Sequence, residues 1–439
     1  MRGVRVALVI CAVVGCNEAI TVDIASDRPI PSAIDHICLG VADTAHGGGQ
    51  FGQSYPVTTL PQSLRVEAGH AESALAWVRG DRGGVPAAFA STHIDFGHDV
   101  TLALPTCVVG PAAGPKVIGD PVGPSSAKLA ASEGLGGTLV VAIGAAGASI
   151  IDARDGSLVA TTAPAPPAGT PLAIIAVDLD GDCDDDLVIV TDGAAPTIWL
   201  RDGDGFTDGG TVGGSIVTAV AAGDLDRDGH TDLVLGYANN LEVWLNNGAG
   251  VFTNAPLITV GGRVSAVSAL AFGDVDGDGY PDLVVGQDGA PLAAWLGDGG
   301  TLLPATSIVP PVTLAVESLA FVDADGDFDP DLAVAVKGDA MRLYIDRDGH
   351  LEDQSFVRLP QPAPIAHKIA IGGWDDGCAP DAVIGADAGA PTLAGQPEGM
   401  FAAADVAPPA TDVLMVDIDD DGDLDAILAT DQGVTWLAR

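Results

Sequence analysis

The residues with the clearest chemistry are aspartates that recur in short, closely spaced sets. The segment 271–291, AFGDVDGDGYPDLVVGQDGAP, places Asp274, Asp276, Asp278 and Asp282 at positions 1, 3, 5 and 9 of one loop. Four carboxylates this close together would repel one another unless a cation lay among them. Hard oxygen ligands in a flexible loop suit Ca²⁺ better than Zn²⁺, which prefers Cys and His, or Mg²⁺, which retains its waters. The spacing therefore predicts a calcium site.

The same spacing occurs five times along the chain, so we expect about five Ca²⁺ sites. Positions 1, 3, 5 and 9 would supply carboxylates, and position 7 would supply a backbone carbonyl. Loop by loop, the expected carboxylate ligands are Asp178, Asp180, Asp182 and Asp186; Asp224, Asp226, Asp228 and Asp232; Asp274, Asp276, Asp278 and Asp282; Asp323, Asp325, Asp327 and Asp331; and Asp417, Asp419, Asp421 and Asp425. The expected carbonyl donors are Asp184, His230, Tyr280, Asp329 and Asp423.

Other interpretations of the loops fit less well. An EF-hand needs Glu at position 12 and flanking helices, whereas here an apolar β-rich run follows position 9 directly. A dockerin-like pair would need helical copies much closer together. Solvated acidic turns without metal are the remaining alternative, but chance would not keep one spacing in five copies. A degenerate copy at 373–381 retains only Asp375 and Asp381, and we expect it to be metal-free.

The loops recur at a nearly constant interval, which indicates a repeat fold. Their first positions, with Gly373 for the degenerate copy, are separated by 46, 50, 49, 50 and 44 residues. After each loop come a Val/Leu-rich strand, a strand ending in an aromatic residue, an Asn/Asp-Gly turn typical of hairpins, and a less regular fourth strand. One more unit, KLAASEGLGGTLVVAIG, lies upstream without ligands. Four antiparallel strands per repeat form a propeller blade, so we predict an all-β, seven-bladed β-propeller.

The ends of the repeat array suggest how the ring closes. The last unit stops at Arg439, after its third strand. A propeller must close to remove its sheet edges, so we expect the segment 116–118 to pair there as the missing strand. We expect the aromatics that end the third strands to pack between neighbouring blades; they are Trp199, Trp244, Trp295, Tyr344 and Trp436.

These units resemble the FG-GAP repeats of integrin α-subunit propellers and the related VCBS-type repeats of secreted bacterial proteins. One unit contains both parts of the name, Phe272-Gly273 and Gly289-Ala290-Pro291, and the tripeptide recurs at 389–391. The resemblance covers about 115–439. It implies a seven-bladed propeller with Ca²⁺ loops between the first and second strands of several blades.

The N-terminus, MRGVRVALVICAVVGC, has the features of an export signal. Arg2 and Arg5 precede an apolar run at 6–14 that is too short to span a bilayer, so we expect 1–15 to be a signal peptide. Val13-Val14-Gly15-Cys16 resembles the lipobox of bacterial lipoproteins, which implies that Cys16 is lipidated and anchors the protein to the cell envelope. Asn17 favours the outer membrane or cell surface. An ordinary cleaved signal is the alternative.

Between the signal and the repeats we expect a tether at 16–31 and a small β domain at 32–110. Apolar runs at 37–41, 63–66, 74–78, 85–91 and 100–104 are separated by turn-rich pieces, which favours antiparallel strands. A β-sandwich-like domain with a disulfide between Cys38 and Cys107 is our prediction, and an extra degenerate repeat is the alternative. The state of Cys183 and Cys378 stays open.

Charge narrows the range of partners. The chain has 18 Lys+Arg against 60 Asp+Glu, a formal charge of -42, which excludes nucleic acid and leaves the N-terminal lipid as the only membrane contact expected. No G-x-S-x-G or H-E-x-x-H motif occurs. We therefore expect a non-enzymatic protein that binds a protein or glycan ligand, on the face opposite the metal loops or at the channel mouth. The alternatives are a structural subunit of a surface assembly and a calcium-dependent polysaccharide lyase-like enzyme.

Overall fold

The computed structural model describes residues 116–439 apart from short gaps, and before residue 116 it describes only the backbone of strands. The gaps are 133–137, 155–156, 183, 204, 215, 239, 256–257, 260–265, 277, 279, 323, 326–329, 348, 373–379, 390, 397–398, 417, 419–423 and 439. The chain divides into two compact units, of which the second comprises Val108–Leu179 and Asp185–Arg439.

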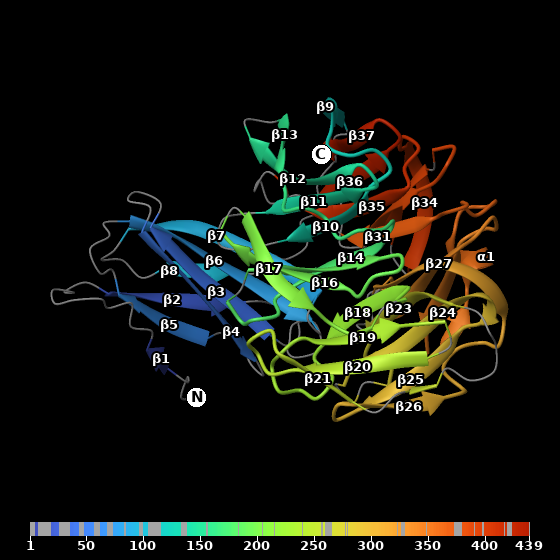
Figure 1. Ribbon diagram of the computed structural model, residues 1–439, viewed down its shortest axis with the longest axis horizontal. Coiled ribbons are helices and arrows are strands. Elements are labelled where there is room, and N and C mark those ends of the chain that lie inside the picture. Colours follow the sequence, from blue (N-terminus) through green and yellow to red (C-terminus); the bar gives the residue numbers. More distant parts are fainter. Residues whose placement is uncertain are drawn as a thin grey trace. The chain divides into compact units, whose positions relative to one another are not determined.

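The strands before residue 108 form two four-stranded sheets (Figure 1). One has the order β1-β5-β2-β8 and the other β4-β3-β6-β7. Their bounds are β1 (Arg5–Ala7), β2 (Ala19–Ala25), β3 (His36–Asp43), β4 (Gly48–Pro56), β5 (Gln62–Glu67), β6 (Ser73–Arg82), β7 (Val85–Asp95) and β8 (Val100–Ala103). All five expected apolar runs overlap strands. The segment expected to be a tether contains β2, because AITVDIA alternates apolar and polar residues with the period of a strand.

Residues 116–439 form seven four-stranded antiparallel meanders among the described residues. The first meander consists of β10 (Lys128–Ser132), β11 (Leu139–Gly144), β12 (Gly147–Arg154) and β13 (Ser157–Thr162), and the second of β14 (Pro171–Val177), β15 (Asp186–Thr191), β16 (Thr197–Asp202) and β17 (Gly205–Thr211). The third consists of β18 (Ala219–Gly223), β19 (Asp232–Gly236), β20 (Asn240–Asn246) and β21 (Phe252–Asn254), and β22 (Ile258–Thr259) also pairs with β20. The fourth consists of β23 (Val267–Gly273), β24 (Asp282–Pro291), β25 (Ala293–Asp298) and β26 (Thr301–Ala305).

The last three meanders are β27 (Thr313–Val322), β28 (Asp331–Val336), β29 (Arg342–Asp346) and β30 (Leu351–Asp353); β31 (Lys368–Gly372), β32 (Asp381–Gly385), β33 (Pro391–Gln396) and β34 (Met400–Val406); and β35 (Asp412–Val416), β36 (Asp425–Thr430) and β37 (Gly433–Ala438) with β9 (Lys116–Val122). The fourth and fifth meanders are joined into one sheet because the end of β24 pairs with β27. A short helix, α1 (Ser355–Arg358), follows β30. No described helix is long and apolar enough to span a membrane.

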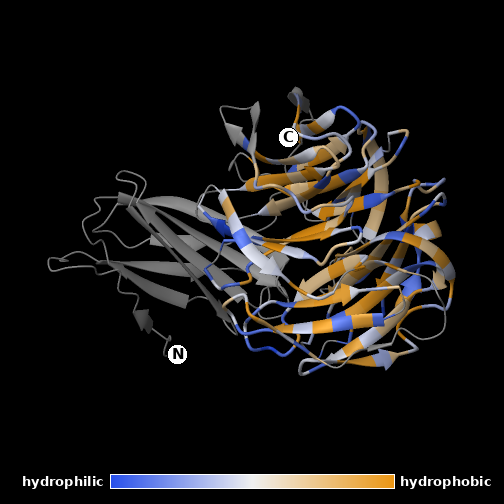
Figure 2. Ribbon diagram, viewed as in Figure 1, coloured by the Kyte–Doolittle hydropathy of each residue, from blue (hydrophilic) through white to orange (hydrophobic). Residues whose placement is uncertain are grey.

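The second strand of each meander is the most deeply buried element. Every residue of β11, β15, β19, β28, β32 and β36 is buried. Continuous apolar runs such as DLVIVT suit a strand that is covered on both faces. Figure 2 shows hydrophobic colours along many strands of residues 116–439. The third-strand aromatics join them: Trp199, Trp295, Tyr344 and Trp436 are at most 3% exposed and belong to clusters that link neighbouring meanders. The predicted packing role of these four is confirmed, whereas Trp244 is only partly buried but packs against the cluster that joins the second and third meanders.

The first and last strands of residues 116–439 pair with each other and close the set of sheets. Hydrophobic clusters join each meander to the next, and a further cluster joins the last to the first. β9 pairs antiparallel with β37, with Val117 opposite Leu437 and Ile118 opposite Trp436. The expected pairing of 116–118 with the last unit is therefore confirmed, as is the all-β, propeller-type fold. The blade number of the whole ring stays a prediction, which the seven meanders support.

Several predicted features lie outside the described residues. Cys16 and Cys107 are among them, and of Cys38 only the β3 backbone is described, so the lipidation and the disulfide remain predictions. Cys183 and Cys378 also lie outside. The ligand-free first unit has a shorter loop than the others, because β10 runs to Ser132 and β11 begins at Leu139.

Candidate functional site

The aspartate at position 9 of each loop fastens the loop to its own sheet. Its Oδ2 accepts the backbone N–H of position 2, at 3.0 Å from Leu179, 2.9 Å from Leu225, 2.8 Å from Val275, 2.8 Å from Ala324 and 3.4 Å from Ile418. In four loops its Oδ1 accepts an N–H of the third strand, at 2.8 Å from Arg201, 2.7 Å from Asn246, 2.9 Å from Gly297 and 2.7 Å from Asp346. These aspartates are buried; they are Asp186, Asp232, Asp282, Asp331 and Asp425.

Positions 1, 3 and 9 come together in three loops. Their carboxylate oxygens lie within 4.8 Å of one another in the clusters Asp178, Asp180 and Asp186; Asp224, Asp226 and Asp232; and Asp274, Asp276 and Asp282. The chemistry fits a cation. Burial, opposed by backbone hydrogen bonds and reinforced by neighbouring carboxylates, raises the pKa of Asp232 to about 7 and that of Asp282 to about 6. A divalent ion would reduce the free-energy cost of burying these carboxylates in their charged form. The buried Oδ1 of Asp180 also accepts no hydrogen bond from described residues, so it is available to a cation.

The aspartate at position 5 makes a hydrogen bond within its own loop. Asp182, Asp228 and Asp278 lie outside these three clusters. Each accepts, through Oδ1, the backbone N–H of position 7, at 2.9 Å from Asp184, 3.0 Å from His230 and 2.8 Å from Tyr280. The short polar side chain thus forms a local turn of the loop backbone. Ligation by position 5, and by the carbonyls of Asp184, His230 and Tyr280, stays a prediction.

The fourth loop has a second source of positive charge. Oδ2 of Asp325, at position 3, lies 2.9 Å from Nη2 of Arg347 and 3.2 Å from Nη2 of Arg358. The side chains of Asp325 and Arg358 are only 8% and 9% exposed, so two guanidinium groups neutralise a carboxylate that was expected to bind Ca²⁺. Apart from Asp331 and Asp425, which are described above, the other predicted ligands of the last two loops lie outside the described residues: Asp323, Asp327, Asp329, Asp417, Asp419, Asp421 and Asp423.

The loops contact the hairpin of the following meander. The N–H of Gly250, in the turn before β21, donates to the carbonyl of Leu179 at 3.0 Å, and the N–H of Gly300 donates to that of Leu225 at 2.8 Å. Arg227, in the second loop, also stacks on the ring of Tyr280 in the third, 4.8 Å from its centroid. An ion in such a loop would therefore stiffen the boundary between two sheets.

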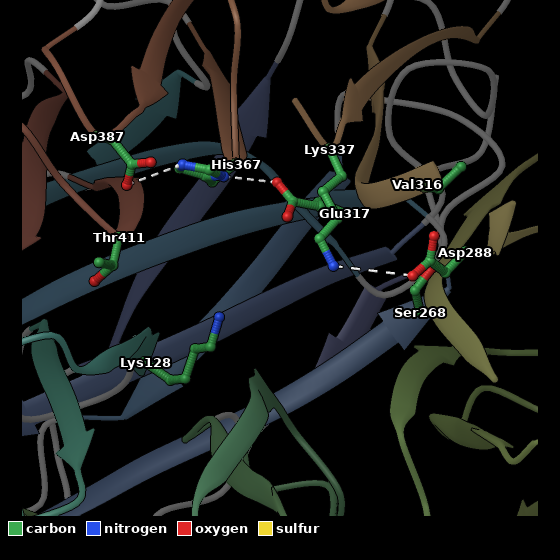
Figure 3. A pocket seen from close by; sticks show the side chains of 9 residues that line it. All are labelled: Lys128, Ser268, Asp288, Val316, Glu317, Lys337, His367, Asp387 and Thr411. Carbon is green, nitrogen blue, oxygen red and sulfur yellow. Dashed lines mark hydrogen bonds and ion pairs between the residues drawn. The ribbon is translucent and has the colours of Figure 1, made fainter. Parts of the chain in front are cut away.

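A pocket of about 450 Å³ lies at the other end of the first strands (Figure 3). Its lining comes from the first, fourth, fifth, sixth and seventh meanders: Lys128, Ser268, Asp288, Val316, Glu317, Lys337, His367, Asp387 and Thr411. His367 directly precedes β31, whereas the degenerate loop follows the end of β31. The pocket therefore lies opposite the metal loops, where the first strands of different meanders converge. We call it the channel-mouth pocket.

Sequence reasoning missed these residues, although the repeats contain a signal for them. Ser268, Glu317, His367 and Thr411 each stand six residues before position 1 of their loop. Asp288, Lys337 and Asp387 each stand fourteen residues after it. In a circular repeat fold, equivalent positions of the repeats lie at the same distance from the central axis. Polar residues at the same position of several repeats therefore predict a shared polar lining.

Ion pairs cross this pocket. His367 Nδ1 lies 2.7 Å from Glu317 Oε2, and its Nε2 lies 3.1 Å from Asp387 Oδ1. The hydrogen bond to Glu317 and the weaker one to Asp387 raise the pKa of His367, against the opposing effect of burial. Lys337 Nζ lies 3.9 Å from Asp288 Oδ2 in a more exposed pair. The dashed lines of Figure 3 mark these contacts.

Two polar groups of the pocket have no partner among the residues that the structure describes. No hydrogen bond or ion pair joins the Lys128 ammonium to another described residue, and Figure 3 shows it extending into the pocket. Ser268 Oγ is shielded from solvent and has no hydrogen-bond partner among the described residues. Because buried polar groups are normally satisfied, this arrangement fits a site that receives a ligand or ordered water.

Comparison with known proteins agrees with the repeat assignment. A family model for the FG-GAP-like repeat matches residues 178–235, 224–285 and 274–334, which contain the three aspartate clusters. Residues 178–334 of the chain thus contain three FG-GAP-like repeats. No curated protein sequence matches it.

Two solved structures are similar to this chain. One concerns the recognition of non-reducing terminal N-acetylglucosamine by an Agrocybe aegerita lectin; it is 14% identical, with a TM-score of 0.48, and the match covers 72% of this chain and 86% of that one. The other is BBS1N in complex with ARL6DN. It is 14% identical, with a TM-score of 0.47, and the match covers 69% of this chain and 87% of that one. At these values the likenesses carry no conclusion about ligands.

Proposed function

We propose that this FG-GAP repeat protein is a non-enzymatic, calcium-stabilised binding protein of the cell envelope, and that its channel-mouth pocket binds a glycan. The pocket is the observation that carries the proposal. Of its nine lining residues only Val316 has an apolar side chain, and the others offer carboxylate, ammonium, imidazole and hydroxyl groups. Such a lining suits a ligand rich in hydroxyls better than the apolar side chains that usually anchor a protein partner.

Three observations support calcium as the stabilising ion. Three loops gather carboxylates from positions 1, 3 and 9, the family model matches those loops, and burial raises the pKa of Asp232 and Asp282 in the absence of a cation. Asp178, Asp180 and Asp186, with their counterparts in the next two loops, would hold the ions. The bound cation would cancel the repulsion between the carboxylates and tie the two strands that flank each loop.

The envelope location rests on the N-terminal sequence. We propose that Cys16 carries the lipid and is the first residue of the mature chain. Mass spectrometry of the N-terminal peptide after membrane extraction tests this. A diacylglyceryl modification on Cys16 that is lost in Cys16→Ala supports lipid anchoring, and an unmodified N-terminus elsewhere in 10–20 overturns it.

Glycan binding is tested on an array probed with the calcium-loaded chain. We expect binding to a restricted set of glycans, and we expect Glu317→Gln to weaken it because a lining carboxylate accepts ligand hydroxyls. His350→Gln, at an exposed histidine outside the pocket, is the matched control. Binding that is unaffected by the pocket variant would place the site elsewhere, and no binding to any glycan would overturn the proposal.

A lyase-like enzyme is the second candidate, because Lys337 and His367 converge on one pocket. Both are paired with carboxylates, and the lining holds as many acids as bases, so a strongly anionic polysaccharide finds little net positive charge. Incubation with uronate-containing polysaccharides decides between the two. Release of unsaturated uronate products that His367→Gln abolishes would favour the enzyme.

A further inference from the structure

We propose that the ligand of the channel-mouth pocket is a terminal sugar acid, whose carboxylate pairs with the ammonium of Lys128. This inference rests on the proposed glycan binding and names its chemical class. It depends on three features of the pocket: an ammonium group without a partner among the described residues, carboxylates with capacity to accept more hydrogen bonds, and a lining in which only one of nine residues has an apolar side chain.

Lys128 is the first residue of β10 and is half-buried. The other basic groups of the lining, Lys337 and His367, already face carboxylates at 3.9 Å and at 2.7 and 3.1 Å. Lys128 has no such partner among the described residues, although the pocket contains three carboxylates. An ammonium that is partly withdrawn from water gains from a charge-assisted hydrogen bond, so this side of the pocket selects an anionic group.

The opposite part of the lining selects hydroxyl groups. Asp288, Glu317 and Asp387 each use one oxygen in an ion pair, and a carboxylate offers about four acceptor sites in all. Ser268, from the fourth meander, adds a hydroxyl that has no partner in the described part of the chain. A ligand with a carboxylate toward the first meander and hydroxyls toward the fourth to sixth meanders would satisfy all of these groups.

Two observations narrow the class further. Only Val316 of the nine lining residues has an apolar side chain, which favours a sugar over the C-terminal carboxylate of a peptide with an apolar last residue. The formal charge of -42 repels a polyanion over the whole protein surface. A single carboxylate next to Lys128 is attracted by the ammonium, and this short-range attraction outweighs the repulsion from distant charges, which salt screens. The acidic sugar of the ligand is therefore a single terminal unit, and not one unit of a chain of charged sugars.

The test is an NMR titration of the calcium-loaded full chain with methyl glycosides of glucuronic, galacturonic and mannuronic acid, each compared with its neutral hexose. We expect at least one acid to bind about tenfold or more tightly than its neutral partner, because only the acid pairs with Lys128. Lys128→Gln should remove that difference. Lys368→Gln is the matched control, because Lys368 is likewise the first residue of a first strand but does not line the pocket.

The outcomes separate this inference from the function on which it rests. Equal binding of acid and neutral sugar, or an acid preference that survives in Lys128→Gln, would overturn the inference and leave glycan binding standing. Binding of a peptide carboxylate with no sugar binding would overturn both in favour of a protein ligand. Thermal melts of both variants check that the fold is intact, and a second substitution, Lys128→Arg, should retain the preference for the acid.

Discussion

At the scale of single residues, the aspartate at position 9 has a structural role that is separable from metal binding. Asp381 occupies this position in the degenerate loop, where two other ligand positions are glycine. It is nevertheless 2% exposed, and its Oδ1 accepts the N–H of Gly395 at 2.7 Å, as its counterparts do in the intact loops. The repeat keeps this aspartate because a buried backbone N–H needs an acceptor, whether or not an ion is bound.

The two arginines at Asp325 lead to a prediction about stability. Arg358→Gln removes one of the two guanidinium groups that face the buried Asp325, and Arg347 still pairs with that carboxylate, so the free energy of unfolding should fall by about 2 kcal/mol, the loss of one charge-assisted hydrogen bond. Arg342→Gln is the control, because its pair with Asp339 is more exposed and should contribute less than about 1 kcal/mol. Urea unfolding measures both, and equal effects of the two substitutions would contradict the assigned role of Arg358.

His367 predicts a pH dependence of stability. Its folded pKa is raised, so its stabilising contribution is fully present below the unfolded value of about 6.5 and is lost as pH rises through the folded value. The groups that face it are Glu317 and Asp387, with Lys337 and Lys128 elsewhere in the pocket. We therefore expect His367→Gln to lower the melting temperature more at pH 5.5 than at pH 9. The reverse order, or the same response in His350→Gln, would refute this.

At the scale of elements, the strand β9 closes the last sheet and should contribute strongly to stability. Without it, β37 becomes an open edge, and Trp436, now 1% exposed, loses cover on one side. The test compares the urea unfolding of a chain that begins at residue 115 with that of a chain that begins at residue 123. The shorter chain should lose about 3 kcal/mol or more of unfolding free energy, on the order of one large buried side chain and its ladder. Equal urea midpoints would mean that β9 does not close the ring.

The elements also show how much the sequence could predict. The period of the aspartate loops and the apolar runs behind them were sufficient to place the repeated strands, because each repeat obeys the same local rules. β4 was missed because the glycines in GGQFGQSYP favour turns, and only pairing with β3 makes this segment a strand. The channel-mouth pocket was missed because each repeat contributes one or two ordinary polar residues, which become a site only when the sheets meet.

At the scale of the whole molecule, charge and calcium are coupled. The loops place carboxylates at the boundaries between sheets, in a chain whose formal charge is -42. Self-repulsion of this size destabilises a compact state, and divalent ions at the boundaries would offset it where the carboxylates are most closely spaced. The same charge would repel polyanions from the channel-mouth pocket, which agrees with the proposed ligand that has a single acidic group.

The measurement that tests the calcium account most directly is a thermal melt in EDTA compared with one in 2 mM CaCl₂. If sites of roughly millimolar affinity contribute about 1 kcal/mol each, filling three should raise the melting temperature of a chain of this size by about 3 to 5 °C. The variant Asp226→Asn with Asp276→Asn should lose most of that calcium-dependent increase. An identical melting temperature in EDTA and in calcium would contradict the claim that these loops hold structural ions.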